Sequence, residues 1–488
     1  MWMDELALAL NIEERGYAEL VTEPLSRKQV APLGYLLLTK AAASVFGVHE
    51  LSLRLLPFLC SLASLVLFWR ISRWFVGTVG LLFGLTLFSL SPSLVFYAGQ
   101  VKPYSCDLAA TMLVAWTALR HGTRASTTFR ALGSGLLGAV AIVMSNPAVP
   151  TAAVIAVLLL LRWFRTNPRP PLAPLAAVLV PWGLAALFGT LSSVRLLDPE
   201  THEYMHTFWA DGFPPRDASV WVWLPRELYG VFAYFLLSTV PGAGVLAAFV
   251  VAAALLALKG AVRLVGENSW TVWILLAPTI VAVLCSLAGL LPLQSRISLF
   301  AGWPILLAAM GGIDALVVAR MRAARRAGGA LAVALVAVAV GPMIDGESPP
   351  YRKEPLRPVL ERVAAERQPS DAAYAYYGGR YAFEYYGPRV GIGEWVQGLE
   401  HRSAPREYLR ELDQFRGEER LWFIFTHAVP MYRELELCRS YLSSIGTISL
   451  EIHGPDERNG TGAWLVDLSD TERSKNVSAE THPLPITR

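Results

Sequence analysis

The chain has 488 residues, of which 54% are hydrophobic and 17% charged, and its mean hydropathy is +0.42. Soluble globular proteins have about 45 to 50% apolar and about 25% charged residues, so this balance indicates a membrane protein with a soluble appendage and excludes disordered, collagen-like and coiled-coil chains. The net charge of +3 does not indicate a nucleic-acid partner, and four cysteines without a CxxC spacing exclude a disulfide framework and a cysteine-ligated zinc site.

Ten apolar segments before residue 345 are candidate membrane spans, because a helix needs about 17 to 25 apolar residues to cross a bilayer. They are 51–69, 77–97, 104–119, 131–147, 150–161, 172–193, 228–258, 270–292, 297–319 and 328–344. The fourth and fifth are short and poorly separated. A further apolar stretch, 32–47, is too short for a comfortable span and is expected to form a helix in the membrane interface.

Lys and Arg residues gather in alternate loops, and short cytoplasmic loops collect such residues. The cations of this set are Arg70, Arg73, Arg120, Arg124, Arg130, Arg162, Arg165, Arg169, Lys259, Arg263, Arg320, Arg322, Arg325 and Arg326. The longer loops at 1–50 and 194–227 are then outside. Ten spans from an outside start return the chain to the outside, so everything after residue 345 is expected to be extracytoplasmic.

From residue 345 the composition turns polar, and helical and strand patterns alternate. Helices are predicted at 354–368, 405–415 and 433–442, and strands at 372–378, 420–427, 447–452 and 463–466. This alternation predicts a small α/β domain at 345–468 whose sheet order stays open. The other parts are an outside loop with the interfacial helix at 1–50, a membrane domain at 51–344, and a polar tail at 469–488 that is expected to be disordered.

Two acids, Asp4 and Glu5, follow Trp2 at the start of the first outside loop. Acids beside a membrane face are costly to desolvate, so they are either solvated or held for chemistry. Their position alone favours the first interpretation.

Four segments change that weighting: MWMDELALALNI, QVAPLGYLLLTKAAASVFGVHELSLRLLPFL, LSPSLVFYAGQVKPYSCDL and LPLQSRISLFAGWPILLAAMGGI. In order and spacing they resemble the multi-spanning glycosyltransferases of family 39 and their bacterial relatives, which share the C-type (GT-C) fold and include protein O-mannosyltransferases and the lipid A aminoarabinose transferase. The resemblance covers residues 1 to about 345. It implies an α-helical, multi-spanning protein of the plasma membrane with an extracytoplasmic α/β domain.

The resemblance also implies an activity. In the family a W-x-D-E motif carries the catalytic acid, and here it reads Trp2-Met3-Asp4-Glu5. The implied enzyme is inverting and moves a sugar from a polyprenyl-phosphate donor to an extracytoplasmic lipid, glycan or protein acceptor. The reaction needs a carboxylate to take the acceptor's proton and cations to hold the leaving phosphate. The resemblance assigns catalysis to Asp4 and Glu5.

The residues that the resemblance assigns to the donor are Lys102, Tyr104, Arg296, Arg54 and Gln100. Alternatives remain for each cation, because Lys102 and Arg296 could be interfacial anchors and Arg54 could only pair with Glu50. Relatives often have Glu where this chain has Gln100, and an amide is neither a base nor a strong metal ligand. No cofactor is certain, and a divalent cation remains open.

Relatives have a complete span before W-x-D-E, whereas this chain begins one residue before the tryptophan. We expect a start codon placed too late rather than a missing first helix. A truly missing helix would favour an inactive scaffold that keeps the fold. A transporter or lipid flippase is a further alternative that many spans permit, although we find no internal repeat and the acids Asp107 and Asp314 lie toward the ends of spans.

The segment 202–206 reads H-E-Y-M-H, which on a helix would place His202 and His206 on one face for zinc, with Glu227 as a third ligand. Pro199 and the aromatic, glycine and proline residues that follow disfavour a metalloprotease. Gly311 and Gly312 are expected to serve close helix packing. The tyrosine-rich segments 374–377 and 381–386 are expected to pack in the α/β core, with acceptor selection as the alternative.

Overall fold

The computed structural model describes residues 1–121, 127–217, 219–237, 252, 255–256, 258–260, 262, 269–344, 354–428, 433–455, 460–475 and 477–484. The chain forms two compact units. One joins Met1–Leu10 to Arg352–Arg488, and the other is Asn11–Tyr351. The sequence suggested domain boundaries at 50, 344 and 468. In the structure the first ten residues group with the C-terminal domain instead.

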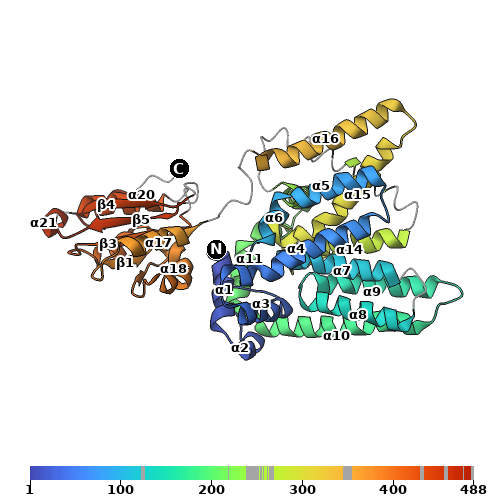
Figure 1. The fold of residues 1–488 in the computed structure, drawn as a ribbon, viewed down its shortest axis with the longest axis horizontal. Helices are drawn as coiled ribbons and strands as arrows, with labels where there is room; N and C mark the ends of the chain where they lie inside the picture. The colour runs from blue at the N-terminus through green and yellow to red at the C-terminus, as the bar shows by residue number, and fades with distance from the viewer. Residues whose placement is uncertain are drawn as a thin grey trace. The chain divides into compact units, whose positions relative to one another are not determined.

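The unit Asn11–Tyr351 is helical among its described residues (Figure 1). Helix α1 (Met3–Glu14) begins in the other unit and ends in this one. The helices that follow are α2 (Tyr17–Thr22), α3 (Leu33–Phe46), α4 (Glu50–Ser72), α5 (Thr78–Leu90), α6 (Pro92–Ala98), α7 (Tyr104–His121), α8 (Thr128–Val143), α9 (Ala148–Arg165), α10 (Leu172–Leu196), α11 (Pro199–Phe208), α12 (Val220–Leu236), α14 (Ser269–Leu287), α15 (Gly302–Val317) and α16 (Arg322–Ile344). Short 3₁₀ turns, η1 (Ala210–Gly212) and η2 (Ser295–Ala301), precede α12 and α15.

Among the described residues, six helices are long and apolar enough to cross a membrane, or seven if the bent pair α5 and α6 counts as one span. The chain is thus a multi-pass membrane protein, with fewer clear spans than the ten predicted. Helix α8 has only 16 residues. Helix α7 has 18 residues but is not apolar enough to count as a clear span. The predicted span 228–258 lies partly outside the described residues.

The predicted span 77–97 is broken, with α5 and α6 meeting at 51°. Ser91 stands between them, and its hydroxyl accepts the N–H of Leu94 and donates to the carbonyl of Phe235. Pro92 follows as the first residue of α6. A proline has no N–H and is suited to the first position of a helix, so a new helix begins here with Ser91 as its cap.

Small residues let the helices of this unit approach closely. Helices α8, α9 and α10 lie side by side (Figure 1). A Cβ atom at Gly135 would lie 2.3 Å from the carbonyl oxygen of Ala177, and one at Gly312 would lie 2.2 Å from that of Leu256. Neither position can hold a larger residue without separating the backbones, which confirms the packing interpretation of Gly312.

The buried acid Asp314 lies near the end of α15 and binds the start of α5. Its carboxylate accepts the N–H groups of Gly77 and, at 2.8 Å, of Gly80. These amides have no partners within their own helix, and the positive end of the helix dipole favours an anion there. Asp314 is therefore used to join two helices.

The C-terminal part of the first unit is an α/β domain. It contains α17 (Leu356–Glu366), β1 (Ala372–Ala375), η3 (Tyr377–Gly379), α18 (Arg380–Tyr386), η4 (Pro388–Val390), β2 (Val396–Gln397), α19 (Arg406–Asp413), β3 (Leu421–Phe425), α20 (Glu434–Ile445), β4 (Thr447–His453), β5 (Gly462–Asp467) and α21 (Thr471–Ser474). The sheet order is β2-β1-β3-β5-β4, with β1 parallel to both β2 and β3 and the pairs β3–β5 and β4–β5 antiparallel (Figure 1). The predicted helices and strands are confirmed, whereas the two-residue strand β2 and the short helices α18 and α21 were not predicted.

Strand β3 is buried on both faces, as its uninterrupted apolar run predicted. Leu421, Phe423 and Phe425 belong to one hydrophobic core with residues of α19 and α20. Trp422 and Ile424 point to the opposite face and are equally buried.

Tyr374, Tyr376 and Tyr377 belong to the domain core, and Tyr385 and Tyr386 are also buried. The core interpretation is therefore confirmed for these five tyrosines, whereas Tyr381 is half-buried.

The tail differs from the expected disorder among its described residues. Ala479 is part of the same core, and the carbonyl oxygens of Val477 and Ala479 accept hydrogen bonds from Arg416 and Arg406 at 2.8 and 2.7 Å. Two half-buried arginines thus hold the tail on the domain.

Candidate functional site

The W-x-D-E motif forms the start of α1, with Met3, Asp4 and Glu5 in its first turn. The Glu5 carboxylate reaches back to the N–H of Trp2 at 3.4 Å, as a glutamate at the third helical position does in a capping box. Glu5 is buried, while Asp4 is partly exposed. The two predicted catalytic acids thus differ: Glu5 holds the helix start and Asp4 is the more accessible group.

Residues of the C-terminal domain hold the same turn. The N–H of Met3 donates to Glu354 Oε2 at 3.3 Å, and Glu354 Oε1 lies 2.8 Å from Nδ1 of His427. The amine of Met1 donates to the hydroxyl of Tyr386 at 2.8 Å. Sequence reasoning did not single out Glu354 or His427, because no local pattern links positions so far apart.

Lys102 lies in the turn between α6 and α7. Its ammonium donates to the side-chain oxygen of Gln29 at 2.7 Å, and the residue is only 7% exposed. A lysine that anchors a protein at the headgroups extends its charged end outward, so this burial argues against the anchor interpretation. Gln29 was not predicted, since it stands in a polar loop with no motif of its own.

Gln100 and Tyr104 surround the same turn. Gln100 is buried, and its carbonyl accepts the N–H of Lys102 at 2.8 Å. The ring of Tyr104 meets that of Tyr97 edge-on, with centroids 5.0 Å apart. The hydroxyl of Tyr97 in turn lies 2.7 Å from that of Tyr234 in α12.

Arg296 lies in the 3₁₀ turn η2, which directly precedes α15. Its guanidinium lies over the ring of Trp209, 5.1 Å from the centroid, and close enough to Tyr97 and Tyr234 to act on both hydroxyls electrostatically. Tyr97 therefore connects the surroundings of Tyr104 with those of Arg296. The sequence marked Arg296 and Tyr104 but missed the aromatic residues between them.

Arg54 has a different neighbourhood. It stands one turn after Glu50 in α4, and the two side chains are 3.7 Å apart. This is the pairing that the alternative interpretation predicted.

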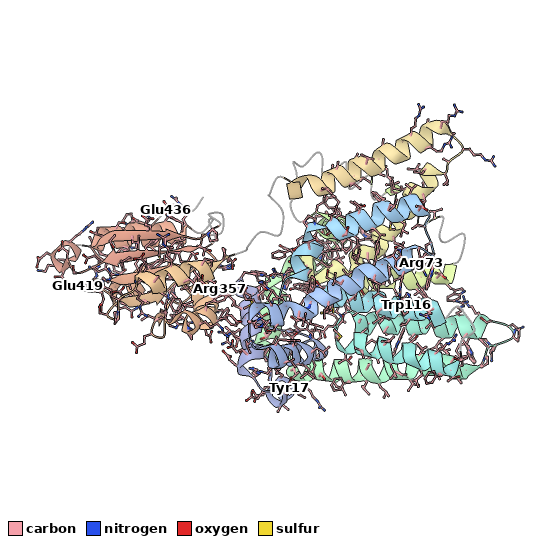
Figure 2. All side chains as sticks on the ribbon, viewed as in Figure 1. Tyr17, Arg73, Trp116, Arg357, Glu419 and Glu436 are labelled. Atoms are coloured by element: carbon pink, nitrogen blue, oxygen red, sulfur yellow. The ribbon has the colours of Figure 1, made fainter. Side chains whose placement is uncertain are left out.

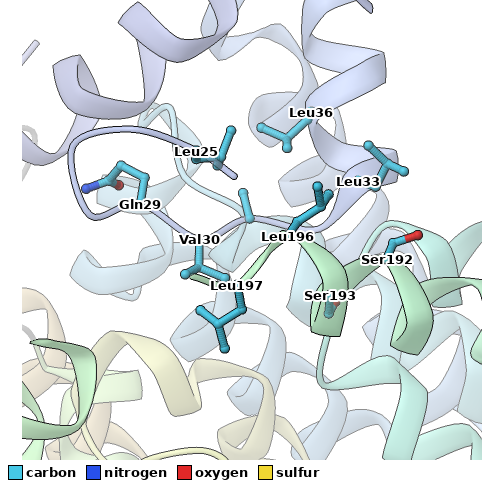
Figure 3. Close-up of a pocket in the computed structure, with 10 residues that line it drawn as sticks. Leu25, Gln29, Val30, Leu33, Leu36, Ser192, Ser193, Leu196 and Leu197 are labelled. Atoms are coloured by element: carbon cyan, nitrogen blue, oxygen red, sulfur yellow. The ribbon is translucent and has the colours of Figure 1, made fainter. Parts of the chain in front are cut away.

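A pocket opens beside Gln29 (Figure 3). Apolar side chains from the loop before α3, from the start of α3 and from the end of α10 form most of its wall, together with Ser192 and Ser193. Gln29 belongs both to this wall and to the contact with Lys102. A polar group that reached Lys102 would therefore have an apolar surface close by.

The H-E-Y-M-H segment forms part of helix α11. His202 and His206 lie on one face with ring centroids 4.5 Å apart, but His206 is stacked on Phe213. The proposed third ligand, Glu227, pairs with Arg226 at 2.9 Å. No group of three or more His, Cys, Asp or Glu side chains suited to a metal ion occurs in the described part of the chain.

No protein-family model and no curated protein matches the chain. Several solved structures are similar to it. The arabinofuranosyltransferase AftD from Mycobacteria is 12% identical, with a TM-score of 0.45 over 95% of this chain and 39% of that one. ArnT from Cupriavidus metallidurans in the apo state is 11% identical, with a TM-score of 0.32 over 95% and 93%. The Archaeoglobus fulgidus oligosaccharyltransferase is 12% identical, with a TM-score of 0.48 over 96% and 70%.

The chain therefore spans less than half the length of the arabinofuranosyltransferase. Two of these proteins are glycosyl-transferring enzymes by name. The donor, acceptor and mechanism of this chain do not follow from likenesses with TM-scores below 0.5.

Proposed function

We propose that the protein is an inverting membrane glycosyltransferase that moves a sugar from a polyprenyl-phosphate donor to an acceptor outside the cytoplasm. The observation that carries this proposal is the Trp2-Met3-Asp4-Glu5 motif at the start of α1. Its Asp4 is partly exposed, while the carboxylate of Glu5 accepts the N–H of Trp2. The acceptor class is a lipid, a glycan or a protein.

Asp4 is the proposed general base. Its carboxylate takes the proton of the acceptor hydroxyl as the acceptor oxygen forms a bond to the anomeric carbon, and the bond from that carbon to the phosphate oxygen breaks. A single displacement of this kind inverts the anomeric centre. The polyprenyl phosphate leaves with the electron pair, and the proton passes from Asp4 to solvent.

Lys102 and Arg296 are the proposed phosphate-binding cations. Lys102 is held by Gln29 rather than extended outward, and Arg296 is oriented by Trp209. Cations fixed before the reaction stabilise developing charge on a leaving phosphate without having to reorganise. Tyr97 and Tyr104, which pack against each other at the same turn, complete this surface.

The test is transfer of sugar from a labelled polyprenyl-phosphate donor by the Asp4→Asn protein in membranes. We expect turnover to fall by about 10² to 10⁴, because that is the usual contribution of a general base. Glu14→Gln, at the other end of α1, is the matched control and should keep full turnover. Undiminished transfer by Asp4→Asn would overturn the proposal.

A further inference from the structure

Two residues with a disfavoured, left-handed backbone conformation lie near the carboxyl ends of the parallel strands β1 and β3. His427, two residues after β3, has φ of 54°, and Glu354, just before α17, has φ of 51°. Residues other than glycine rarely adopt this left-handed conformation, and it persists only where the surroundings enforce it. Gly378, after β1, provides such a surrounding, since a Cβ there would lie 2.5 Å from the Thr426 oxygen and 2.9 Å from the Cβ of His427.

The two residues with left-handed backbone, Glu354 and His427, contact each other through the carboxylate of Glu354. Glu354 is only 4% exposed, and its two oxygens have separate partners: Oε1 lies 2.8 Å from His427 Nδ1, and Oε2 accepts the N–H of Met3 at 3.3 Å. A buried carboxylate is costly unless hydrogen bonds satisfy it. The partners of Glu354 come from the end of β3 and from the start of α1, so this one group joins the sheet to the W-x-D-E turn.

The start of α1 is thus held by two carboxylates. Glu5 accepts the N–H of Trp2, and Glu354 accepts the N–H of Met3. These amides have no backbone acceptor within the helix, and an anion beside them is favoured by the helix dipole. Asp4 is the next residue, so the direction of its side chain depends on the turn that Glu354 fixes.

We propose that Glu354, oriented by His427, is a positioning residue for Asp4. This inference rests on the proposed function, in which Asp4 is the base. The α/β domain then contributes to catalysis through a buried contact with the catalytic turn, without touching the substrate.

The first measurement is steady-state kinetics of the full-length protein. Glu354→Ala should lower kcat by about 10- to 100-fold, because a displacement of about 1 Å at a reacting group has effects of this size, while KM for the donor stays within about twofold. Glu354→Gln keeps an acceptor oxygen for Met3 and should recover most of the activity.

The matched control is Glu434→Gln. Glu434 is also 4% exposed, but it binds Tyr376, Tyr408 and Arg402, all within the α/β domain. Burial raises the pKa of Tyr376 far above its ordinary value, so this phenol stays protonated and donates to Glu434. A kcat for Glu354→Ala equal to that of Glu434→Gln would overturn the positioning role.

The second measurement is hydrogen exchange of the peptide 1–10 in the full-length protein. Glu354→Ala should increase exchange in this peptide while β1 and β3 keep their protection, whereas Glu434→Gln should leave the peptide unchanged. Unchanged exchange in Glu354→Ala would overturn the inference. This measurement is independent of turnover, so full activity of Asp4→Asn would refute the proposed function and leave the contact separately testable.

If Glu354→Ala unfolds the domain, lost protection of β3 will show it. His427→Gln then decides, because it changes the partner of Glu354 without removing the carboxylate. His427→Gln should raise exchange in the peptide 1–10 and lower kcat by about 3- to 10-fold. The expected loss is smaller than for Glu354→Ala, because the carboxylate of Glu354 is misoriented but still present. Wild-type exchange and wild-type kcat in His427→Gln would overturn the inference.

Discussion

Large apolar side chains are exposed on many membrane helices but mostly buried in the α/β domain. Leu184 in the middle of α10 is 65% exposed, and many other large apolar side chains of the helical unit are exposed in the same way. In the domain, large apolar side chains are mostly in the core, and charged ones such as Arg357, Glu419 and Glu436 lie on its surface (Figure 2). The difference shows that the surrounding solvent, lipid or water, decides which face of an element is apolar.

Buried acids differ between the two regions as well. Asp314 serves the backbone, because it accepts the N–H groups at the start of α5. Asp371 in the domain binds side chains, with Arg420 at 2.7 Å and Trp422 at 2.8 Å. Burial raises the pKa of Asp371, but the hydrogen bonds from Arg420, Gln368 and Trp422 outweigh it, and the pKa lies below its ordinary value. Asp371 therefore stays ionised at neutral pH.

The largest expected effect concerns the two kinds of apolar side chain. Phe423→Ala should lower the free energy of unfolding of the α/β domain by about 3 to 5 kcal/mol, because it leaves a cavity in a packed core. Leu184→Ala should change the stability of the helical unit by less than about 0.5 kcal/mol, because this side chain is exposed. Hydrogen exchange at increasing urea concentration measures both effects, at the β3 amides for Phe423→Ala and at the α10 amides for Leu184→Ala. Equal losses would contradict the comparison.

A charge placed on each exposed surface should sharpen the difference. Leu184→Arg should disfavour membrane insertion of α10 by about 2.5 to 3.5 kcal/mol, the cost of an arginine near the middle of a span. Leu399→Arg in the domain, where the leucine is 54% exposed, should change stability by less than about 0.5 kcal/mol. The inserted fraction of α10, measured in microsomes, tests the first part. Normal insertion of Leu184→Arg would mean that this face of α10 is covered by protein.

The smallest expected effect compares two arginines with similar ring contacts. Arg296 lies 5.1 Å from the centroid of Trp209. Arg73, which Figure 2 labels at the end of α4, lies 5.0 Å from the centroid of Trp69. If Arg296 binds the donor phosphate, Arg296→Ala should raise the KM for the donor about tenfold, as expected for a charge-assisted contact.

Arg73→Ala should leave that KM unchanged, because the cation pattern predicts that Arg73 lies in a cytoplasmic loop. Equal effects would make Arg296 an ordinary anchor. Arg263, on the same predicted side as Arg73, lies outside the described residues and offers no such geometric match.

The sequence by itself determined the elements and their solvent. Period and length predicted α4, α10, α17 and β3, because each element shows its buried face in its own local pattern. The W-x-D-E motif likewise marked Asp4 without any tertiary information. The prediction of ten spans was wrong where the local signal was weak. One such place is Ser91 and Pro92, where a helix cap and a proline interrupt an apolar run.

Only the tertiary structure decided which of these elements meet. Lys102 binds Gln29 from a loop 73 residues away, and Met3 binds Glu354 at a separation of 351 residues. The sheet order and the association of the first ten residues with the C-terminal domain belong to the same class. Local periodicity fixes which face of an element is buried, but partners distant in the chain are selected by packing and by the need of buried polar groups for hydrogen bonds.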